Sequence, residues 1–537
     1  MDKLAIVRAY HERTKHQLKK YARGPQTLDW DAQPNPFRHF NGCDRVALPL
    51  SARDDKTTFQ SLYQTTYGQV SPISLQNIGM LMELSMALSA WKTLGPDRWS
   101  LRVNPSSGNL HPTECYLLLP ETDEFKAGVY HYLSYEHALE QRCIFTSENR
   151  VPASDRFLLG LSTIYKRESW KYGERAYRYC QLDVGHALAA IRYACSVLGW
   201  ECQLLDEYGD QQISKLLGLD RQQDFVDAEP ESPDLLLKIG MHPQQNTAIN
   251  LDALTRLAET SPWRGRANRL TDDNFYKWPV INEVSQACYK PPTTTNDQTG
   301  TDSFPAMPQC DPHILANDIV RQRRSAQSFD ANAPGLSLPL FERILHSILP
   351  RPGILPWDCL PWYPRIHIIL FIHRVTGLEP GLYALPRSEQ GEKLLRRQIN
   401  HGFSWIQSVN LGTGLPLYLL QEANVGNLAR MLACHQPIAS DSAFSLAMLA
   451  EFDEPLKIAP WQYRHLFWEA GLIGQILYLE AEVAGIRGTG IGCFFDDALH
   501  ELLGLESSCF QDLYHFTIGT PKTDKRIQNE PPYAHIM

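Results

Sequence analysis

Three glycines recur at the same spacing in both halves of this chain of 537 residues. In each half they are separated by 14 and then 19 residues, at Gly185, Gly199 and Gly218 and again at Gly471, Gly485 and Gly504. Apolar residues follow helical spacing between the first two glycines of each set, and both sets close on the letters LLGL. Glycine often ends a helix, so one shared glycine would be coincidence. The matched glycines, helices and endings together predict an internal duplication.

Other segments match between the halves in the same order. An early amphipathic helix is predicted in SPISLQNIGMLMELSMALS and in LSLPLFERILHSIL, and a short strand in AGVYHYL and in PGLYALP. Near the end of each half, LLLKIGMHP corresponds to FTIGTPK. Because helices and strands are mixed rather than strictly alternating, each half is predicted to be an α+β domain. A duplicated chain often folds as an internal pseudo-dimer, with its halves related by an approximate twofold axis.

The chain is too long for a single hydrophobic core, so two domains are expected. A stretch rich in proline and threonine, Tyr289–Pro312, has almost no apolar periodicity and marks a linker. We place the first domain, with its N-terminal extension, at residues 1–280, the linker at 281–310 and the second domain at 311–537.

Composition narrows the class of protein. The net charge is −9 with acids and bases interspersed, which argues against a nucleic-acid partner. The first residues lack the apolar run of a secretory signal, and IHIILFIH is too short to cross a bilayer. The 12 cysteines form no CxxC or CxxxC pair, so reduced core thiols and no metal site are expected. These features predict a cytoplasmic protein that neither enters a membrane nor binds nucleic acid.

The halves differ in a few polar segments, and these carry the predicted chemistry. The second half alone has RQRRSAQSF at Arg321–Phe329, RGTGIGCFFDD at Arg487–Asp497 and GTPKTDKR near its end, whereas only the first half has PSSGNLHP. Arginine forks onto phosphate oxygens, glycine lets backbone N–H groups approach a flat ligand, and serine and asparagine bind the edges of heteroaromatic rings. The distribution predicts an anionic, partly aromatic cofactor that bridges the two halves.

Each segment also has a plainer interpretation. RQRRS is typical of a solvated helix face, GTGIG of a turn at a strand edge, and PSSGN of a surface loop. The combination, spread one-sidedly over a duplicated chain, favours a binding site.

Together, RRSAQSF, NPSSGNLHPTECYLL, DVGHALAAIRYACSVLGW and GTGIGCFFDD resemble the nitroreductase-like flavoproteins, and most closely the SagB-type dehydrogenases. The resemblance covers nearly the whole chain except the linker. It implies two fused nitroreductase-like α+β sandwich domains that share flavin mononucleotide (FMN) at their interface. One complete site per chain is implied, because the first half lacks the arginines and glycines that a second site would need.

The resemblance also implies the residues that bind FMN. The arginine-serine motif would hold phosphate and ribityl, the serine-asparagine turn would lie along the isoalloxazine, and the glycine-rich segment would lie near its pyrimidine side. The implied residues are Pro105, Ser106, Ser107, Asn109, Arg323, Arg324, Ser325, Gln327, Gly490, Ile491 and Gly492, with Arg526 and Lys522 as terminal basic contacts to phosphate.

Azoline dehydrogenases of the same family use a lysine-tyrosine pair as acid and base, which Lys171 and Tyr172 match. The alternative is an exposed lysine beside a core aromatic residue. The implied activity is hydride transfer between FMN and a small organic or peptidic substrate. The alternatives are a nitro- or quinone reductase that takes electrons from a nicotinamide, and a non-catalytic flavin-binding scaffold.

Overall fold

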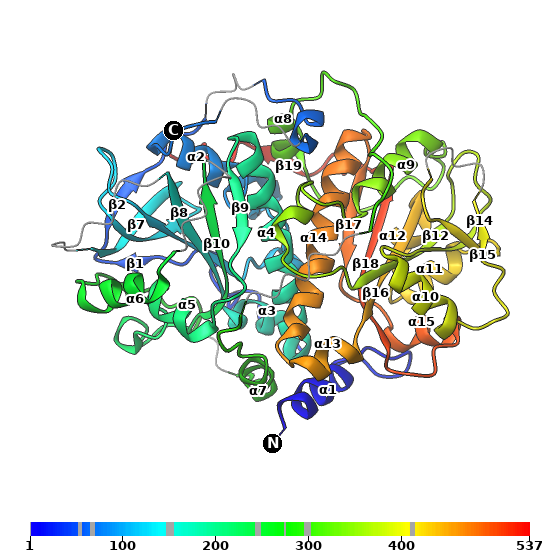
Figure 1. The fold of residues 1–537 in the computed structure, drawn as a ribbon, viewed down its shortest axis with the longest axis horizontal. Coiled ribbons are helices and arrows are strands. Elements are labelled where there is room, and N and C mark those ends of the chain that lie inside the picture. The colour runs from blue at the N-terminus through cyan, green and yellow to red at the C-terminus, as the bar shows by residue number, and fades with distance from the viewer. Residues whose placement is uncertain are drawn as a thin grey trace.

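The computed structural model describes residues 2–51, 56–64, 70–145, 155–241, 249–272, 275–294, 302–408 and 414–536. Two antiparallel sheets, each of seven strands, lie on either side of a central pair of helices (Figure 1). The first sheet has the order β2 (Asp44–Ala47), β7 (Ala138–Ile144), β6 (Gly128–Leu133), β5 (Thr113–Leu119), β8 (Arg156–Thr163), β10 (Ser232–Gly240), β9 (Glu201–Leu204).

The second sheet repeats this arrangement. Its order is β14 (Ile406–Gln407), β15 (Tyr418–Glu422), β13 (Gly381–Leu385), β12 (Ile366–Ile372), β16 (Phe444–Glu451), β18 (Phe510–Gly519), β17 (Arg487–Ile491). The strands predicted from AGVYHYL and PGLYALP are β6 and β13, which occupy the same position in their sheets, and LLLKIG and FTIG end β10 and β18. The predicted α+β class is confirmed, and the matching strand order of the two sheets agrees with the predicted duplication.

The central helices α4 (Ala176–Val197) and α14 (Gln462–Val483) have 22 residues each and pack against each other. They begin earlier than the glycine pattern predicts, so Gly185 and Gly471 lie inside helices rather than at their ends. A Cβ on Gly471 would lie 2.1 Å from the Leu182 carbonyl oxygen and 3.0 Å from the Gly185 Cα. These matched glycines therefore let the helix backbones touch at the pseudo-twofold axis.

The last matched glycines end the helices that follow. Helices α5 (Asp210–Leu217) and α15 (Asp496–Leu503) have eight residues each, and Gly218 and Gly504 follow them with φ of 72° and 68°. This left-handed conformation is easy only for glycine. The predicted early helices are α2 (Leu75–Glu83) and α9 (Leu338–Ser347).

The remaining helices cover the sheets and the ends of the central pair (Figure 1). They are α1 (Lys3–Arg13), α3 (Tyr165–Tyr172), α6 (Leu251–Thr260), α7 (Pro279–Ala287), α8 (Ala316–Gln322), α10 (Glu389–Gln398), α11 (Gly426–Leu432), α12 (Pro437–Asp441) and α13 (Asp453–Ile458). Helix α7 corrects the predicted linker 281–310, whose first residues are helical because Pro279 starts a helix that buries Ile281 and Val284. Residues 295–301 of that linker lie outside the described residues.

Each half lends a terminal segment to the other. Near the C-terminus, β19 (Gln528–Glu530) pairs with β3 (Leu88–Leu94) of the first half, which also pairs with β4 (Asp97–Arg102). Tyr533 is fully buried there and donates to the Ser134 carbonyl at 3.0 Å. In the other direction, His11 of α1 contacts Tyr463 and Gln511 of the second half at 3.1 and 3.0 Å.

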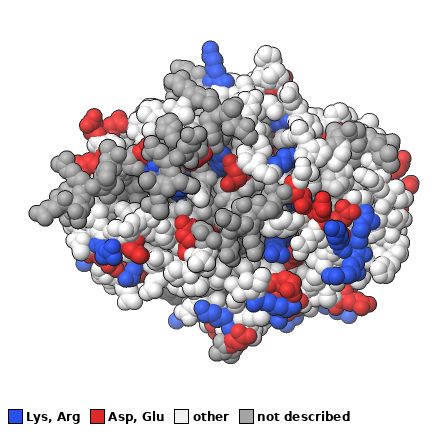
Figure 2. Space-filling model, viewed as in Figure 1, with Lys and Arg blue, Asp and Glu red and all other residues white. Residues whose placement is uncertain are grey.

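One hydrophobic cluster runs through both halves and includes the central helices, while a smaller cluster lies on the outer face of each sheet. Basic and acidic side chains are interspersed on the face shown in Figure 2. Within the described residues, the model has no helix with the length and apolar character needed to span a membrane.

Candidate functional site

A cleft between the halves contains two adjoining cavities, of about 410 and 890 Å³. Both are lined by Lys92 of β3 and by the segment 324–327 that follows α8. The smaller cavity extends to α4, to β17 and to the polar turn that contains the short 3₁₀ helix η2 (Ser107–Asn109). The larger cavity extends to α8 and to the C-terminal segment. The predicted arginine-serine, glycine-rich and serine-asparagine motifs thus meet at one cleft.

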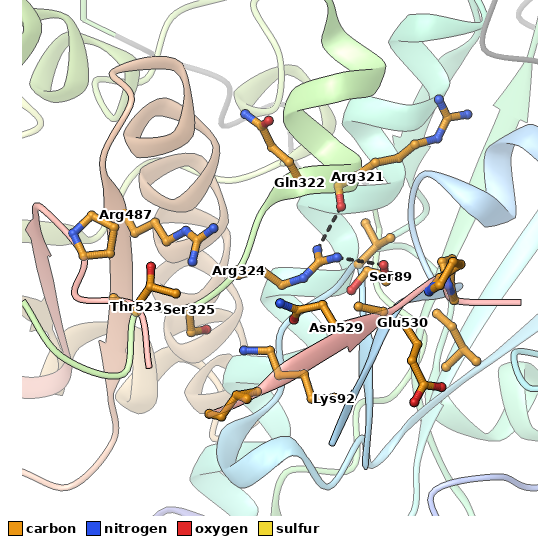
Figure 3. A pocket seen from close by; sticks show the side chains of 18 of the residues that line it. Ser89, Lys92, Arg321, Gln322, Arg324, Ser325, Arg487, Thr523, Asn529 and Glu530 are labelled. Carbon is orange, nitrogen blue, oxygen red and sulfur yellow. Dashed lines mark hydrogen bonds between the residues drawn. The ribbon is translucent and has the colours of Figure 1, made fainter. Parts of the chain in front are cut away.

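The larger cavity is lined by several cations (Figure 3). Lys92, Arg324, Arg487 and Lys522 come from four separate segments. Burial, and then the charge of Arg323, lower the pKa of Arg324 to about 10, and burial with the neighbouring guanidinium groups lowers the pKa of Lys92. Cations that depress one another's pKa in this way favour an anion between them. This end of the cleft suits a phosphate group.

The two predicted arginines differ in their surroundings. Arg323 is buried, donates to the Arg102 carbonyl at 3.0 Å and lies over the Tyr478 ring, so it lines only the smaller cavity. Arg324 donates to the Ser89 carbonyl of the first half at 2.7 Å and lines both cavities. Its backbone N–H donates to Glu482, which also lies 3.5 Å from Arg487 and partly offsets the positive charge.

The predicted terminal basic contacts separate in the structure. Lys522 lines the larger cavity. Arg526 lines neither cavity; its side chain is 78% exposed and forms a short-range ion pair with Asp524 at 2.7 Å. Arg487, the first residue of the glycine-rich motif, was not among the predicted phosphate contacts, but it lines the larger cavity. The prediction for Arg526 is therefore corrected in favour of Arg487.

The glycine-rich segment is held against the arginine-serine segment. Ser325 and Tyr478 hydroxyls are 2.9 Å apart, and the Gly490 N–H donates to the Tyr478 hydroxyl at 3.0 Å. A Cβ on Gly490 would lie 1.8 Å from the Tyr514 hydroxyl, so a side chain does not fit there. Gly490, Ile491 and Gly492 all line the smaller cavity, as do Pro105, Ser106, Ser107, Asn109 and Gln327.

The serine-rich turn is docked onto two buried carboxyl groups. Ser107 donates to Asp183 of α4 from its backbone N–H and its hydroxyl, both at 3.1 Å. The Ser106 hydroxyl lies 3.4 Å from Glu168 of α3. Burial raises the pKa of Asp183 to about 7, and burial followed by the Asp183 charge raises that of Glu168 well above its ordinary value. The turn therefore covers a pair of carboxyl groups that can hold a proton near neutral pH.

Asn109 lines the smaller cavity and also supports the serine-rich turn. Its amide nitrogen donates to the Ser100 carbonyl at 2.8 Å, and its amide oxygen lies 2.9 Å from a ring nitrogen of His111. Its φ of 61° is in the left-handed region, which asparagine tolerates better than most residues. Both ends of the side chain are thus used within the turn, although the residue lines the cavity.

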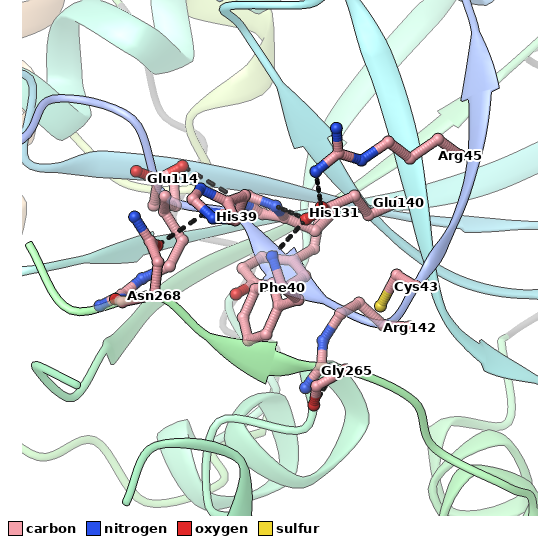
Figure 4. A network of polar contacts seen from close by, with 12 residues as sticks. His39, Phe40, Cys43, Arg45, Glu114, His131, Glu140, Arg142, Gly265 and Asn268 are labelled. Atoms are coloured by element: carbon pink, nitrogen blue, oxygen red, sulfur yellow. Dashed lines mark hydrogen bonds and ion pairs between the residues drawn. The ribbon is translucent and has the colours of Figure 1, made fainter. Parts of the chain in front are cut away.

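A buried polar network fixes the far end of the turn. Arg167 of α3 donates to the His111 carbonyl at 2.8 Å and forms an ion pair with Glu114. His131 lies between Glu114 and Glu140, at 3.1 and 3.3 Å (Figure 4). Burial alone would lower the pKa of His131, but its hydrogen bonds to both glutamates raise it to about 9. A charged chain thus links the turn to strands β5, β6 and β7.

Of the predicted acid-base pair, only Tyr172 lines the cavity. Its hydroxyl lies over Gly108, where a Cβ would come within 2.4 Å of it. Lys171 points elsewhere: its ammonium lies 5.7 Å from the Trp30 ring centre and 5.5 Å from that of Tyr172. Burial lowers the pKa of Lys171, and burial followed by the Glu168 charge raises that of Tyr172 well above its ordinary value.

Comparison with known proteins bears on this architecture. No protein-family model matches the chain. A protein of Methanocaldococcus jannaschii, provisionally named a nitroreductase, is 21% identical over 179 residues, which is 32% of this chain and 82% of that protein. The crystal structure of a provisionally named nitroreductase from Anabaena variabilis matches 96% of this chain and 99% of its own, with 20% identity and a TM-score of 0.67. The chain has a nitroreductase-like fold.

A further match joins part of the chain to an Escherichia coli microcin synthetase complex that was solved with a truncated precursor peptide. It has 19% identity and a TM-score of 0.26, and it covers 45% of this chain and 94% of that one.

The second pseudo-symmetric position of the nitroreductase-like fold holds a cavity of about 300 Å³ with a different lining, which includes Trp357, Asp358 and Glu469. The segment LPWDCLPWYP, which stands where the first half has the serine-rich turn, contains the 3₁₀ helix η5 (Trp357–Cys359). Arg192 of α4 clamps Asp358 of η5 with hydrogen bonds of 2.9 and 2.6 Å, and η5 packs on β9. The corresponding elements at the other position, η2 and β17, instead line the 410 Å³ cavity.

The cleft fits FMN at both ends. The buried Arg323 Nε and Ser89 Oγ have no hydrogen-bond partner within the part of the chain that the structure describes, and both residues line the cleft. Gly490 and Gly492 pack so closely on Tyr514 and Tyr179 that no side chain fits, since a Cβ on Gly492 would lie 2.3 Å from the Tyr179 ring, and the backbone alone therefore faces the cavity. Cations at one end, and glycines with polar groups at the other, match a phosphate and a flat heteroaromatic ring.

The sequence did not reveal Asp183 and Lys92, which line the cleft, or the buried Glu168, which lies behind the serine-rich turn. Asp183 lies two residues before the matched Gly185, in the helix predicted to be buried. This position was a usable signal, because a buried carboxylate needs a polar partner. Lys92 carried no signal, since a single lysine in a strand is usually solvated.

Proposed function

We propose that this protein is an FMN-dependent oxidoreductase that transfers hydride between the flavin and a small organic or peptidic substrate. The observation that carries the proposal is the composition of one cleft: a group of cations at one end, including Lys92, Arg324, Arg487 and Lys522, and a glycine-rich strand facing a serine-rich turn at the other. When bound, FMN would supply the two-electron chemistry, which no side chain of the cleft can supply alone.

The chain's own residues would bind and orient the cofactor. Arg324 and Lys92, with Arg487 and Lys522, would hold the phosphate, since guanidinium and ammonium donors form strong charge-assisted bonds to it. Ser325 would contact the linking chain between phosphate and ring. The backbone around Gly490 would approach the ring edge, where N–H donors stabilise negative charge.

Proton handling would fall to groups on α3 and α4. Tyr172 reaches the cavity from one side of the serine-rich turn, and Asp183 lines it from the other. Because the pKa of Asp183 is raised to about 7, it can take up or release a proton close to neutral pH. Lys171, one residue from Tyr172, would tune that hydroxyl rather than touch the substrate.

The SagB-type assignment rests on the Lys171 and Tyr172 pair and is a narrower proposal than the flavin chemistry. It predicts oxidation of an azoline-containing peptide. The competing activity is reduction of a nitro compound or quinone with electrons from a nicotinamide, which the fold equally supports.

The first test counts flavin in the purified full chain. Because the first half lacks the arginine and glycine motifs that a second site would need, we expect one FMN released per chain after denaturation. A ratio near two would contradict the single site, and failure to bind added FMN would contradict the proposal.

The second test identifies the reaction through the flavin absorbance. The loaded protein is mixed without oxygen with an azoline-containing peptide, or with a reduced nicotinamide, and bleaching of the flavin is recorded. Once reduced, the protein is mixed with a nitro compound or a quinone. Bleaching by the peptide supports the dehydrogenase, whereas bleaching only by the nicotinamide supports the reductase. Bleaching by neither favours a scaffold.

A further inference from the structure

Three segments of the chain bring two cysteines together at the edge of the smaller cavity. Cys493 follows the glycine-rich strand β17 and lines the cavity. Cys434 lies in the loop between α11 and α12, which runs beside the Cys493 segment, because the Phe495 N–H donates to the Leu432 carbonyl at 2.9 Å. His16 and Tyr21, from the N-terminal segment, border the same place: the Asp496 N–H donates to the His16 carbonyl at 3.0 Å, and the Tyr21 ring centre lies 5.8 Å from that of Phe495. Both thiols are partly exposed and unbridged.

The surroundings of Cys493 favour a thiolate. The Ala22 N–H donates to His16 Nδ1 at 2.9 Å, so the neutral His16 ring carries its hydrogen on Nε2 and can donate it to Cys493. The neighbouring Cys434 thiol, followed by His16 and the charge of Arg175, outweighs burial and lowers the pKa of Cys493, whereas the pKa of Cys434 is raised. One thiol is thus the better nucleophile and the other stays protonated.

The loop that carries Cys434 is fixed in a strained conformation. Cys434 and His435 have φ of 50° and 62°, which residues other than glycine rarely adopt in succession. The Gln436 amide donates to the carbonyls of Ala433 and Cys493 at 2.9 and 3.0 Å and so ties the loop to the segment that carries Cys493. The fold holds the two thiols beside each other by several independent contacts.

We propose that Cys493 and Cys434 form a redox-active dithiol centre that reacts with low-molecular-weight disulfides. This proposal goes beyond the flavin chemistry and does not depend on it. Other partly exposed cysteines lack such surroundings: burial raises the pKa of Cys43 to about 11 and also raises that of Cys509.

The reaction consists of two exchange steps. The Cys493 thiolate attacks one sulfur of the disulfide, which breaks the S–S bond, forms a mixed disulfide and releases one thiolate. The Cys434 thiol then loses its proton to solvent, and its sulfur attacks Cys493 Sγ and releases the second thiolate. Two cysteine thiols are oxidised to one disulfide, and the two substrate sulfurs are reduced and take up protons from solvent.

The experiment uses the reduced full chain and glutathione disulfide as the probe. After exposure, free thiols are alkylated, and the digested protein is analysed by mass spectrometry. We expect a peptide cross-linked between Cys434 and Cys493 that dithiothreitol reverses. Cys434→Ser should trap glutathione on Cys493, while Cys493→Ser should leave Cys434 unmodified. Cys509→Ser serves as a matched control and should behave as wild type.

The same samples are compared with and without FMN, because thiol exchange should proceed in both. A failure of FMN to bind would therefore leave this result intact. The proposal is overturned if Cys434 and Cys493 remain alkylatable while Cys509 reacts, or if the Cys434→Ser protein carries no glutathione on Cys493. Should a variant fail to fold by circular dichroism, the wild-type cross-link alone decides.

Discussion

The contact between the central helices predicts a large effect from a single methyl group. In Gly471→Ala, the new Cβ would lie 2.1 Å from the Leu182 carbonyl oxygen, well inside the 3.4 Å at which ordinary contact begins. The obstructing atoms are backbone, so no side chain can rotate away. Helix α14 must therefore move away from α4.

The size of the effect follows from two opposing contributions. Overpacking a core costs about 1–3 kcal/mol, and a clash with backbone belongs at the upper end of that range. Replacing glycine by alanine within a helix returns about 1 kcal/mol. The net loss should be about 2 kcal/mol, which is roughly a 30-fold rise in the unfolding constant when 1.4 kcal/mol is taken as tenfold.

The assay is urea denaturation followed by tryptophan fluorescence and circular dichroism. Gly426→Ala is the control, because a Cβ there meets its nearest atom at 3.5 Å, at the start of α11. We expect a lower midpoint for Gly471→Ala only. FMN affinity should also fall, since Asp183 and Tyr478 line the cavity from the two helices. If Gly471→Ala is as stable as Gly426→Ala, the close helix crossing is wrong.

Three further predictions concern the cleft and its support. Arg324→Ala should weaken FMN binding by about 10- to 150-fold, for a loss of about 1.5–3 kcal/mol, whereas Arg526→Ala should retain wild-type affinity in a dialysis assay. Tyr172→Phe should keep FMN but slow turnover by about 10²-fold or more, and Lys171→Met should slow it less; equal rates in stopped-flow would remove Tyr172 from proton transfer. The pKa of His131 is raised to about 9 from 6.5, so its stabilisation is complete below pH 6.5 and is lost as pH rises through 9. The urea midpoint of the wild-type protein should fall between pH 6.5 and pH 9. If the midpoint of His131→Gln depends on pH as steeply as that of the wild type, this prediction is wrong.

The sequence predicted the duplication because the matched glycines have the same structural task in both halves: Gly185 and Gly471 lie at the helix crossing, and Gly218 and Gly504 end the following helices. It also located the cleft, since differences between two related halves single out residues that the shared fold does not need. Roles within the cleft were harder to predict. Asn109 lines the predicted cavity, but the sequence did not predict that its amide also bonds to Ser100 and His111.

The remaining errors share a physical cause. Ser107 and Asp183 are 76 positions apart, and no local pattern reports that they meet. Arg526 lies in a basic segment, but its side chain bonds to Asp524, two positions before it, rather than lining the cavity. Helix α7 was not predicted, because its few apolar residues adjoin a polar, proline-rich stretch. The composition of that stretch led to the prediction of a linker.

The unequal halves have a consequence for how the molecule must be made. If each half were a separate polypeptide, two copies of the same half could also pair. A pair of second halves would have the arginines without the serine-rich turn, and a pair of first halves would have the turn without the arginines. Joining the halves in one chain enforces the single productive pairing. The exchanged terminal segments add a condition in time: β3 gains its partner β19 only when synthesis reaches Gln528–Glu530, so the first half stays incomplete until nearly the whole chain has been made.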